Sequence, residues 1–204
     1  MSSDNFEGHN ADAVTTVYTV GHSNHELTKF LDLLSDHGVE VVADVRTSPF
    51  SRYNPQFNRE PLAAVLQARG VGYVFLGKEL GGRPEGDEFY DADGHVRYDR
   101  VATSELFQAG LERLLEGAQP ARLALMCSEG DPAQCHRHLL IARVLDERGV
   151  AVVHIEPDGS VLDYRSVAER TPIQRSLFAG EEDSQWRSPL SVSQSTQPSR
   201  SSDD

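Results

Sequence analysis

Short apolar runs alternate with amphipathic stretches along most of this chain, and the alternation predicts strands and helices in turn. The apolar runs predict buried strands at residues 13–21, 39–46, 71–77, 121–127 and 150–156. The amphipathic stretches between them predict helices at residues 24–38, 59–70, 104–118 and 131–149. Strands that alternate with helices favour right-handed crossovers and a parallel sheet with a helical layer on each face.

We therefore expect a single three-layer α/β domain with a mostly parallel sheet of about five strands and helices on both faces. The polar connection at residues 78–100 contains several glycines and predicts a lid or a binding loop. Residues 156–164 predict a turn that leads into an edge hairpin. Apolar periodicity is missing from residues 1–14, and residues 179–204 are rich in Ser, Gln, Pro and acidic side chains. We place the domain at residues 15–178, between two disordered tails.

The charge balance narrows the classes of partner. The 204 residues carry a formal net charge of −13, and such a field repels phosphate, which argues against broad nucleic-acid binding. No apolar run approaches the length of a membrane span, and the polar N-terminus does not resemble a signal peptide. We expect a cytoplasmic protein without a membrane partner, whose two cysteines are free thiols.

Open parallel sheets bind ligands beyond the carboxyl ends of their strands, so the residues that follow each predicted strand form the candidate site. The strand ends present the same kinds of side chain, namely His, Arg, Ser, Cys and acidic groups. Together with a glycine pair, these candidates are His22, Ser23, Asp44, Arg46, Ser51, Arg52, Gly81, Gly82, Arg83, Cys127, Glu129, Cys135, His136 and Arg137. Scattered surface residues would rarely coincide in this way, and we expect one shared pocket.

Both cysteines lie in one strand-to-helix junction. Asp131 and Pro132 predict the start of a helix just before Cys135. A helix N-terminus and the neighbouring cationic side chains lower the pKa of a thiol and favour the reactive thiolate. The junction is therefore the best candidate for nucleophilic chemistry.

Four residues are catalytic candidates. Cys127, at the end of the fourth predicted strand, is the best-placed nucleophile, and Glu129 or His22 would move protons. Asp44 is the fourth candidate. A plainer interpretation stays open for Cys127, because a small apolar residue suits the end of a buried strand.

The arginines predict an anionic substrate, with a nucleotide or a nucleic-acid component as the expected class. Guanidinium groups bind phosphate and carboxylate through paired hydrogen bonds. The predicted binding residues are Ser23, Arg46, Ser51, Arg52, Gly81, Gly82, Arg83, Cys135, His136 and Arg137. For Arg46, a buried ion pair with Asp44 or Glu129 is an equally good interpretation.

A metal site is the weaker interpretation of the same junction. Cys127, Cys135, His136, His138 and His22 offer soft ligands that suit zinc or iron. The chain has no C-x2-C pair, however, and two histidines two positions apart on a helix point to different sides. We therefore predict no metal ligand, leave the cofactor undetermined, and interpret His138 as a surface residue.

Before the predicted C-terminal tail, the segment QRSLF resembles the peptide with which bacterial proteins dock on the sliding clamp of DNA replication. Gln174 would be the polar anchor, and Leu177 and Phe178 would enter an apolar pocket of the clamp. The sliding clamp is therefore a candidate partner. Alternatively, Leu177 and Phe178 fold back onto the domain.

Four segments, TVGHSNHELTKFLDLL, VVADVRTSPFSRYNPQFN, LGKELGGRP and LMCSEGDPAQCHR, resemble successive blocks of the DUF488 family, a domain of unknown function. The resemblance extends from about Val17 to His154, and its most specific block is C-x-E followed by C-H-R. It implies an α/β fold and supports the site residues, but it implies no reaction.

Three functions follow as hypotheses. The first is a hydrolase or group transferase that acts on an anionic, nucleotide- or nucleic-acid-related substrate. The second is a thiol-redox or metal-binding protein that uses Cys127 and Cys135. The third is a non-catalytic DNA-repair accessory that docks on the sliding clamp.

Overall fold

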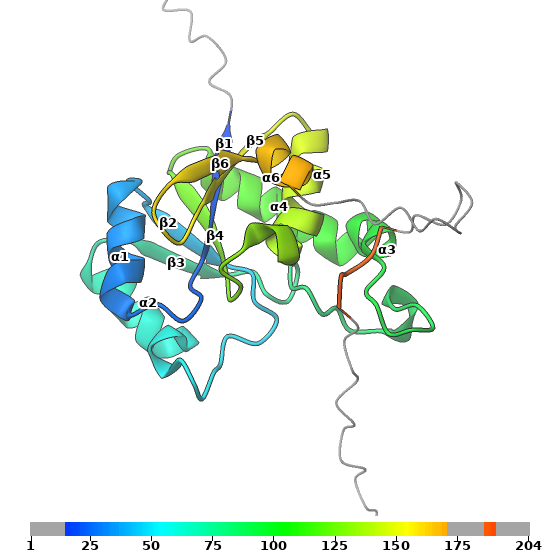
Figure 1. Ribbon diagram of the computed structural model, residues 1–204, viewed down its shortest axis with the longest axis horizontal. Helices are drawn as coiled ribbons and strands as arrows, with labels where there is room; N and C mark the ends of the chain where they lie inside the picture. The colour runs from blue at the N-terminus through cyan, green and yellow to red at the C-terminus, as the bar shows by residue number, and fades with distance from the viewer. Residues whose placement is uncertain (1–14, 171–185, 191–204) are drawn as a thin grey trace, which may run out of the picture.

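Six strands form one sheet in residues 15–170 and 186–190, the parts of the chain that the computed structural model describes (Figure 1). They are β1 (Thr16–Gly21), β2 (Val41–Asp44), β3 (Gly72–Phe75), β4 (Leu123–Cys127), β5 (Ala151–Ile155) and β6 (Val161–Asp163). The strand order is β3-β2-β4-β1-β5-β6, with parallel pairing except between β5 and β6. The predicted α/β class is confirmed. The expected strand number of about five is corrected to six, because the turn after β5 leads into a short antiparallel edge strand.

The helices follow the amphipathic stretches of the sequence except at their ends. They are α1 (Leu27–Asp36), α2 (Arg59–Ala68), α3 (Tyr98–Thr103), α4 (Glu105–Ala118), α5 (Arg143–Glu147) and α6 (Tyr164–Arg170). The Ser104 hydroxyl begins α4 by accepting the Phe107 amide. The predicted loop at residues 78–100 contains the start of α3 and a 3-10 turn at Asp87–Phe89.

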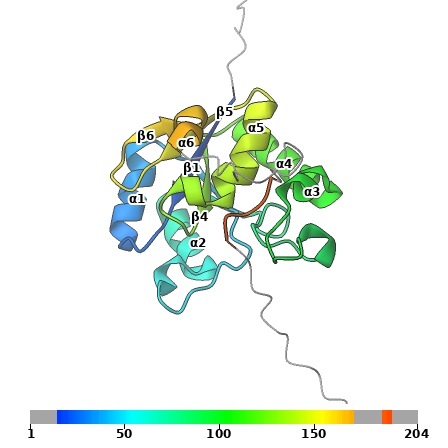
Figure 2. The ribbon, with the colours of Figure 1, turned by 45° about the vertical axis from the view of Figure 1, so that its right-hand side comes forward.

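An apolar cluster covers each face of the sheet and gives the domain three layers. α1 and α2 pack on one face, where Phe30 and Leu62 are fully buried. α4 and the helical stretch that ends in α5 pack on the other face, around Leu111 and Leu140. Figure 2 shows these helices on either side of the strands. Both faces of the central strands are covered, which explains their near-continuous apolar sequences.

The chain leaves β2 and β4 in opposite directions. After β2 the chain passes through α2 on one face of the sheet to β3, at one edge. After β4 it passes through α5 on the opposite face to β5, toward the other edge. A crevice opens between the carboxyl ends of two strands that diverge in this way, and open parallel sheets bind ligands there. The topology therefore brings the residues after β2 close to the end of β4.

The predicted helix at residues 131–149 is broken within the cysteine junction. A 3-10 turn, Pro132–Gln134, begins where the Asp131 carboxylate accepts the Ala133 amide at 2.9 Å. Cys135 is then extended, with φ −116° and ψ 141°, and a π-helical stretch, Arg137–Ala142, leads into α5. Cys135 thus lies between two helical segments and not within one long helix. Irregular π-helical turns are frequent at functional sites.

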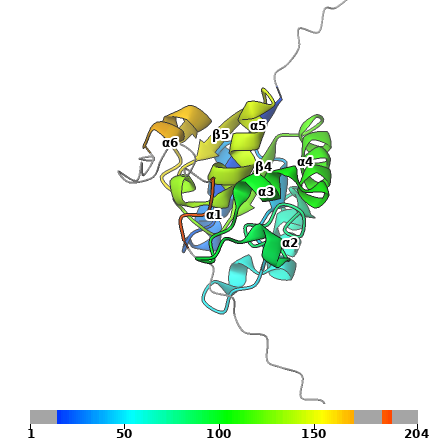
Figure 3. The same ribbon diagram turned by 90° about the vertical axis from the view of Figure 1, so that its right-hand side faces the viewer.

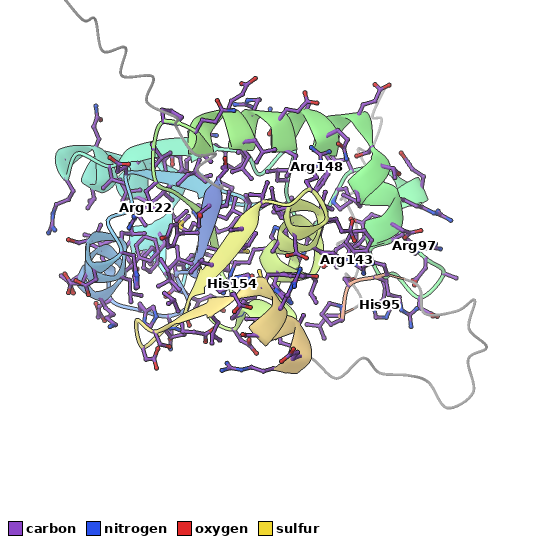
Figure 4. All side chains as sticks on the ribbon, turned by 90° about the horizontal axis from the view of Figure 1, so that it is seen from above. His95, Arg97, Arg122, Arg143, Arg148 and His154 are labelled. Carbon is purple, nitrogen blue, oxygen red and sulfur yellow. The ribbon has the colours of Figure 1, made fainter. Side chains whose placement is uncertain are left out.

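Residues 186–190 pack on the domain, although the sequence places them in a disordered tail. The Trp186 indole donates to the Leu139 carbonyl at 2.7 Å. The Ser188 amide donates to the Val96 carbonyl, and the Ser188 hydroxyl accepts the Val96 amide, both at 2.9 Å. In Figure 3 this orange-red segment runs beside the yellow-green chain that precedes α5. Figure 4 shows His95 and Arg97 next to it. We call residues 186–190 the C-terminal strap.

Several sequence predictions lie outside the described residues. These are the tail at residues 1–14, the rest of the tail at residues 179–204, and the clamp-like residues Gln174, Leu177 and Phe178. Within the described residues, no helix combines the length and the apolar character that crossing a membrane requires.

Candidate functional site

A pocket of about 470 Å³ opens in the crevice between the carboxyl ends of β2 and β4. Arg46, just after β2, and Cys127, the last residue of β4, both line it. Arg83 comes from the connection before α3, and Leu190 comes from the C-terminal strap. The structure thus brings residues from three predicted strand ends to one pocket.

Two thiols, a carboxylate and an imidazole meet at the floor of this pocket. The Sγ atoms of Cys127 and Cys135 lie 2.9 and 3.1 Å from the same Oε2 of Glu129. The Nδ1 of His136 lies 3.7 Å from Cys127 Sγ and 3.8 Å from Cys135 Sγ. Cys127 and Cys135 are only 3% and 1% exposed, so their sulfurs lie in a medium of low dielectric constant, whereas Glu129 is exposed to solvent. We call these four residues the floor cluster.

The surroundings separate the pKa values of the two thiols. The hydrogen bond with Cys135 and burial both raise the pKa of Cys127. Burial opposes ionisation of Cys135, but the hydrogen bond from Cys127 and the charge of Arg137 outweigh it and hold the pKa of Cys135 below its usual value. The pair therefore favours a thiolate at Cys135 beside a protonated Cys127. Cys127, the nucleophile predicted from the sequence, is the thiol whose pKa is raised, and Cys135 is the thiol whose pKa is lowered.

The ring of His136 is held in one orientation. Its Nε2–H donates to the Val45 carbonyl at 3.1 Å, which directs Nδ1 toward the sulfurs. Burial opposes ionisation of the ring, but the hydrogen bond with Cys135 outweighs it and raises the pKa of His136. Gly82 lies directly against the ring, and a Cβ at that position would come within 2.8 Å of Nδ1. Gly82, which was predicted to allow the close approach of a ligand, lines the pocket and also lies against His136.

Arg137 is fully buried and holds the loop that carries Glu129. Its Nη1 donates to the Glu129 carbonyl, and its Nη2 donates to the Gly130 carbonyl at 2.8 Å. Its Nε has no hydrogen-bond partner within the described residues. Gly21 lets the loop pass close to β1, since a Cβ there would lie 1.9 Å from the Glu129 carbonyl oxygen. Arg137 thus organises the floor cluster from behind and does not line the pocket.

Asp44, Arg46 and His22 form a buried network beside the floor cluster. The Arg46 Nε and Nη2 donate to the two oxygens of Asp44 at 2.9 and 2.6 Å, which is the buried ion pair considered for these residues. Arg46 Nη1 donates to His22 Nε2 at 3.2 Å, and His22 Nδ1–H donates to the Ser23 carbonyl at 2.7 Å. Burial lowers the pKa of His22 to about 4, so the ring is neutral near pH 7. Each of its two nitrogens then takes part in one of these hydrogen bonds.

Other predicted binding residues lie away from the pocket lining. The Ser51 hydroxyl accepts two amides of its own turn, and Arg52 is exposed on the same loop. Gly81 packs against Thr47, where a Cβ would come within 2.5 Å of the hydroxyl. Ser23 is absent from the lining as well. These residues shape the loops around the pocket.

The interpretation of His138 as a surface residue is wrong. Its Nδ1 lies 3.1 Å from His154 Nε2, and His154 Nδ1 lies 2.7 Å from the Thr19 hydroxyl, all in the interior. Figure 4 marks His154 on β5. The extended residue at 135 rotates the following helix so that His138 faces the sheet, whereas His136 faces the floor cluster.

The sequence analysis missed several residues that line the pocket, among them Tyr98, Gln134 and the strap residues Ser188–Leu190. Gln134 lies inside the cysteine junction and carries no charge that would attract notice. A signal for the strap does exist, because the one tryptophan of the chain, Trp186, lies in an otherwise polar tail. Such a large aromatic side chain is costly to leave in water.

Comparisons with known proteins produced one family match. The family model described as Domain of unknown function DUF488 matches residues 26–144, which is more than half of the chain. The match begins after β1, so His22 and Ser23 lie outside it. No curated protein and no solved structure matched. Because its C-x-E and C-H-R blocks and the strands that carry them fall within or beside the matched range, we conclude that the chain belongs to the DUF488 family.

Proposed function

We propose that this protein is an enzyme, a hydrolase or group transferase, that acts on an anionic, nucleotide-related substrate in the pocket between β2 and β4. One observation carries the proposal. The floor cluster places two thiols, a carboxylate and an imidazole at the base of a pocket that has an arginine on its wall. Nucleophile, proton acceptor and anion ligand are the parts that such a reaction needs.

Arg83 is the arginine best suited to hold the anionic group of the substrate. Its guanidinium has no hydrogen-bond or ion-pair partner among the described residues, and it lines the pocket. Arg46 also reaches the pocket, but Asp44 already neutralises its charge at 2.6 Å. A guanidinium without a partner gains more from a phosphate or carboxylate than one that is already paired.

The rest of the lining fits a small molecule with an apolar part. A volume of about 470 Å³ lies within the range of small-molecule sites. Tyr98, Pro189 and Leu190 supply apolar surface, and Ser48 and Gln134 supply polar groups. A nucleoside moiety offers both kinds of surface, which favours a nucleotide over inorganic phosphate.

Glu129 is the group placed to move a proton. One of its oxygens contacts both thiols, so it can take the proton of an attacking group and return it to the leaving group. His22 was the other candidate for this role. Both of its ring nitrogens are engaged, and we assign it to holding Arg46.

A thermal-shift screen of nucleoside monophosphates, sugar phosphates and inorganic phosphate tests the proposal. A ligand of the pocket raises the melting temperature of the wild type and loses most of this effect in Arg83→Ala. Arg52→Ala is the matched control, because it removes an exposed arginine outside the pocket lining and should leave the shift unchanged. A shift that both variants retain places the ligand elsewhere and contradicts the proposal.

A thiol-redox function is the second candidate, and the closeness of the two cysteines favours it. Both are free thiols, and both sulfurs contact one oxygen of Glu129. Mild oxidation followed by thiol titration tests this candidate. Loss of both thiols, reversed by a dithiol reductant, would support it, and two titratable thiols after oxidation would exclude it.

A further inference from the structure

We propose that the floor cluster binds one zinc-type divalent metal ion through Cys127, Cys135, His136 and Glu129. This inference rests on the proposed function in one respect: the metal ion would activate the nucleophile of the proposed hydrolysis or group transfer. Donor atoms of the right kinds line the pocket, because the Nδ1 of His136 and the Oε2 of Glu129 each lie within 3.8 Å of both sulfurs. The two sulfurs and the ring nitrogen all lie within 4.8 Å of one another.

The distances between these atoms are close to those of a tetrahedral site. With metal–sulfur bonds of about 2.3 Å and metal–nitrogen or metal–oxygen bonds of about 2.0 Å, neighbouring ligand atoms lie about 3.3–3.8 Å apart. The Nδ1 of His136 lies 3.7 and 3.8 Å from the two sulfurs. The Glu129 oxygen lies nearer, at 2.9 and 3.1 Å, which is a hydrogen-bond distance. A metal ion that replaces the thiol proton would require this carboxylate to withdraw from the sulfurs by about 0.5 Å and to turn toward His136, because Glu129 does not belong to the group whose donor atoms all lie within 4.8 Å of one another.

The second contact of His136 prepares its ring for a metal. Metal-bound histidines usually donate their other ring N–H to a carbonyl or carboxylate, which fixes the tautomer and the orientation. His136 does so with the Val45 carbonyl at 3.1 Å, and Gly82 closes the other side of the ring. Nδ1 then faces the two sulfurs, where a metal ion would replace the proton that the ring shares with Cys135.

Charge gives an independent argument. The Oε2 of Glu129 and the Sγ of the buried Cys135 lie 3.1 Å apart, a separation at which a proton or a cation has to lie between the two atoms. Arg137 is completely buried, and its guanidinium contacts backbone carbonyls in place of a carboxylate. Two thiolates and one carboxylate around a divalent ion leave one negative charge, which Arg137 balances. A buried charge is costly without such a partner.

The donor set selects the metal and suggests the chemistry. Two thiolates with one imidazole suit Zn²⁺, Co²⁺ or Fe²⁺ and do not suit Mg²⁺ or Ca²⁺. If Glu129 leaves the fourth position, a water takes it and is activated as a nucleophile. The water oxygen then attacks the substrate, Glu129 takes the water proton, and the same carboxylate delivers it to the leaving group.

Cobalt titration of the chelator-treated full chain under reducing conditions tests the inference, together with metal analysis of freshly purified protein. We expect one metal equivalent per chain, and on Co²⁺ addition the thiolate-to-cobalt charge-transfer band and strong visible bands of a tetrahedral site. Cys127→Ser and Cys135→Ser should each weaken the charge-transfer band, because one of the two thiolates remains in each variant. His136→Ala should bind about 10–100-fold more weakly.

Two controls keep the result interpretable. His37→Ala removes a histidine that contacts Gly159 and should titrate as the wild type does. Circular dichroism of each metal-free variant shows whether it is folded, and His136→Ala gives a second readout if a serine variant is not. Substoichiometric metal in fresh protein, a cobalt spectrum without thiolate bands, or equal affinity in wild type and His136→Ala would overturn the inference.

The outcome can be separated from that of the proposed function. Binding of a nucleoside monophosphate to the metal-free wild type, lost in Arg83→Ala, would sustain the proposed function even if no metal bound. One equivalent of thiolate-bound cobalt with no ligand in the thermal-shift screen would sustain the metal centre and contradict the substrate assignment. A disulfide that forms between the two cysteines on mild oxidation and is reversed by a dithiol reductant, with no metal in the fresh protein and no ligand in the screen, would favour the redox candidate over both.

Discussion

At the residue scale, the chemistry of the floor cluster depends on side chains that hold it in place. Arg137 fixes the loop of Glu129 through two carbonyl groups, and Gly82 leaves space for the ring of His136. Neither residue needs to touch a substrate. Their effect is to fix four reactive groups in a small volume, where low dielectric strengthens each interaction.

Replacing Arg137 should destabilise the fold. Arg137→Met leaves two loop carbonyls without a donor in the interior, which costs about 2–4 kcal/mol of unfolding free energy. Arg137→Lys keeps the charge but cannot reach both carbonyls, so its loss should be smaller. Urea denaturation followed by circular dichroism measures both. Arg52→Met is the control, and a loss for Arg137→Met no larger than that of this exposed arginine would refute the role assigned to Arg137.

Gly82→Ala should disturb the floor cluster with little effect on overall stability. The new Cβ would come within 2.8 Å of the His136 ring, which must turn away from the sulfurs. We expect Co²⁺ affinity to fall by about 10–100-fold, as for loss of an orienting contact. Gly117→Ala, in α4, is the control, because alanine is well tolerated in a helix. Unchanged cobalt affinity in Gly82→Ala would show that the ring is not held by this contact.

At the element scale, the most consequential feature is the break between β4 and α5. The sequence predicts one helix there, and the cap at Asp131 and the strand before it agree with the structure. The extended Cys135 and the π-helical stretch could not be foreseen. Apolar periodicity reports which face of a helix is buried, but it does not report a local change in hydrogen-bond spacing. The error on His138 follows from this, since the break turns it inward.

The buried histidines should make stability fall in mild acid. Burial lowers the pKa of His22 and His138 to about 4 and that of His154 to about 3, whereas unfolded histidine titrates near 6.5. Between these values the unfolded chain binds more protons, so the unfolding free energy decreases as the pH falls from 6.5 toward 4. Each histidine contributes up to about 1.4 kcal/mol per pH unit.

Urea denaturation at a series of pH values measures this slope. His154→Gln keeps a polar side chain that can hydrogen-bond with Thr19 but cannot titrate. In this variant the unfolding free energy should therefore depend less steeply on pH, by roughly 1.4 kcal/mol per pH unit, the contribution of one titrating group. A slope equal to that of the wild type would mean that His154 is not kept neutral by burial.

The C-terminal strap should be a docked element of the domain in solution. Trp186 packs under Arg143, whose guanidinium lies 4.2 Å from the ring, and Ser188 is bound to Val96 and His95. The emission of this single tryptophan should be blue-shifted and poorly quenched by acrylamide in the wild type. Ser188→Ala removes two hydrogen bonds of the strap and should shift the emission to the red. Emission in the wild type that equals that of the urea-unfolded chain would show that the strap is not docked.

At the scale of the whole molecule, the sequence predicted the class of fold and the end of the sheet where the candidate site lies. Alternating strands and helices determine both, because parallel strands with crossovers place their carboxyl ends along one edge. The sequence could not predict which side chains at that edge touch one another. His22 and Arg46 lie close to the floor cluster, but they are hydrogen-bonded to each other, and Arg46 is also paired with Asp44. Of the two arginines that line the pocket, Arg83 is the one whose guanidinium has no ion-pair partner among the described residues.

The pocket residues of the C-terminal strap were not predicted from the sequence because they are far along the chain from the other residues of the pocket. Ser188 and Leu190 line the pocket, although they follow α6 by a segment with no apolar periodicity. The docking of the strap depends on a few side chains, and these do not produce a periodic apolar pattern in the sequence. The complete pocket is therefore a property of the folded chain, assembled from β2, β4, the connection before α3 and the strap.

A crystal structure of the protein with a bound nucleoside monophosphate tests the central claim most directly, namely that one pocket both holds an anion and presents the floor cluster to it. The account predicts the phosphate within hydrogen-bond distance of the Arg83 guanidinium, with the ligand facing Cys135, His136 and Glu129. A ligand bound elsewhere, for example in the cleft lined by Thr15, Glu40 and Arg122 at the opposite end of the strands, would contradict it.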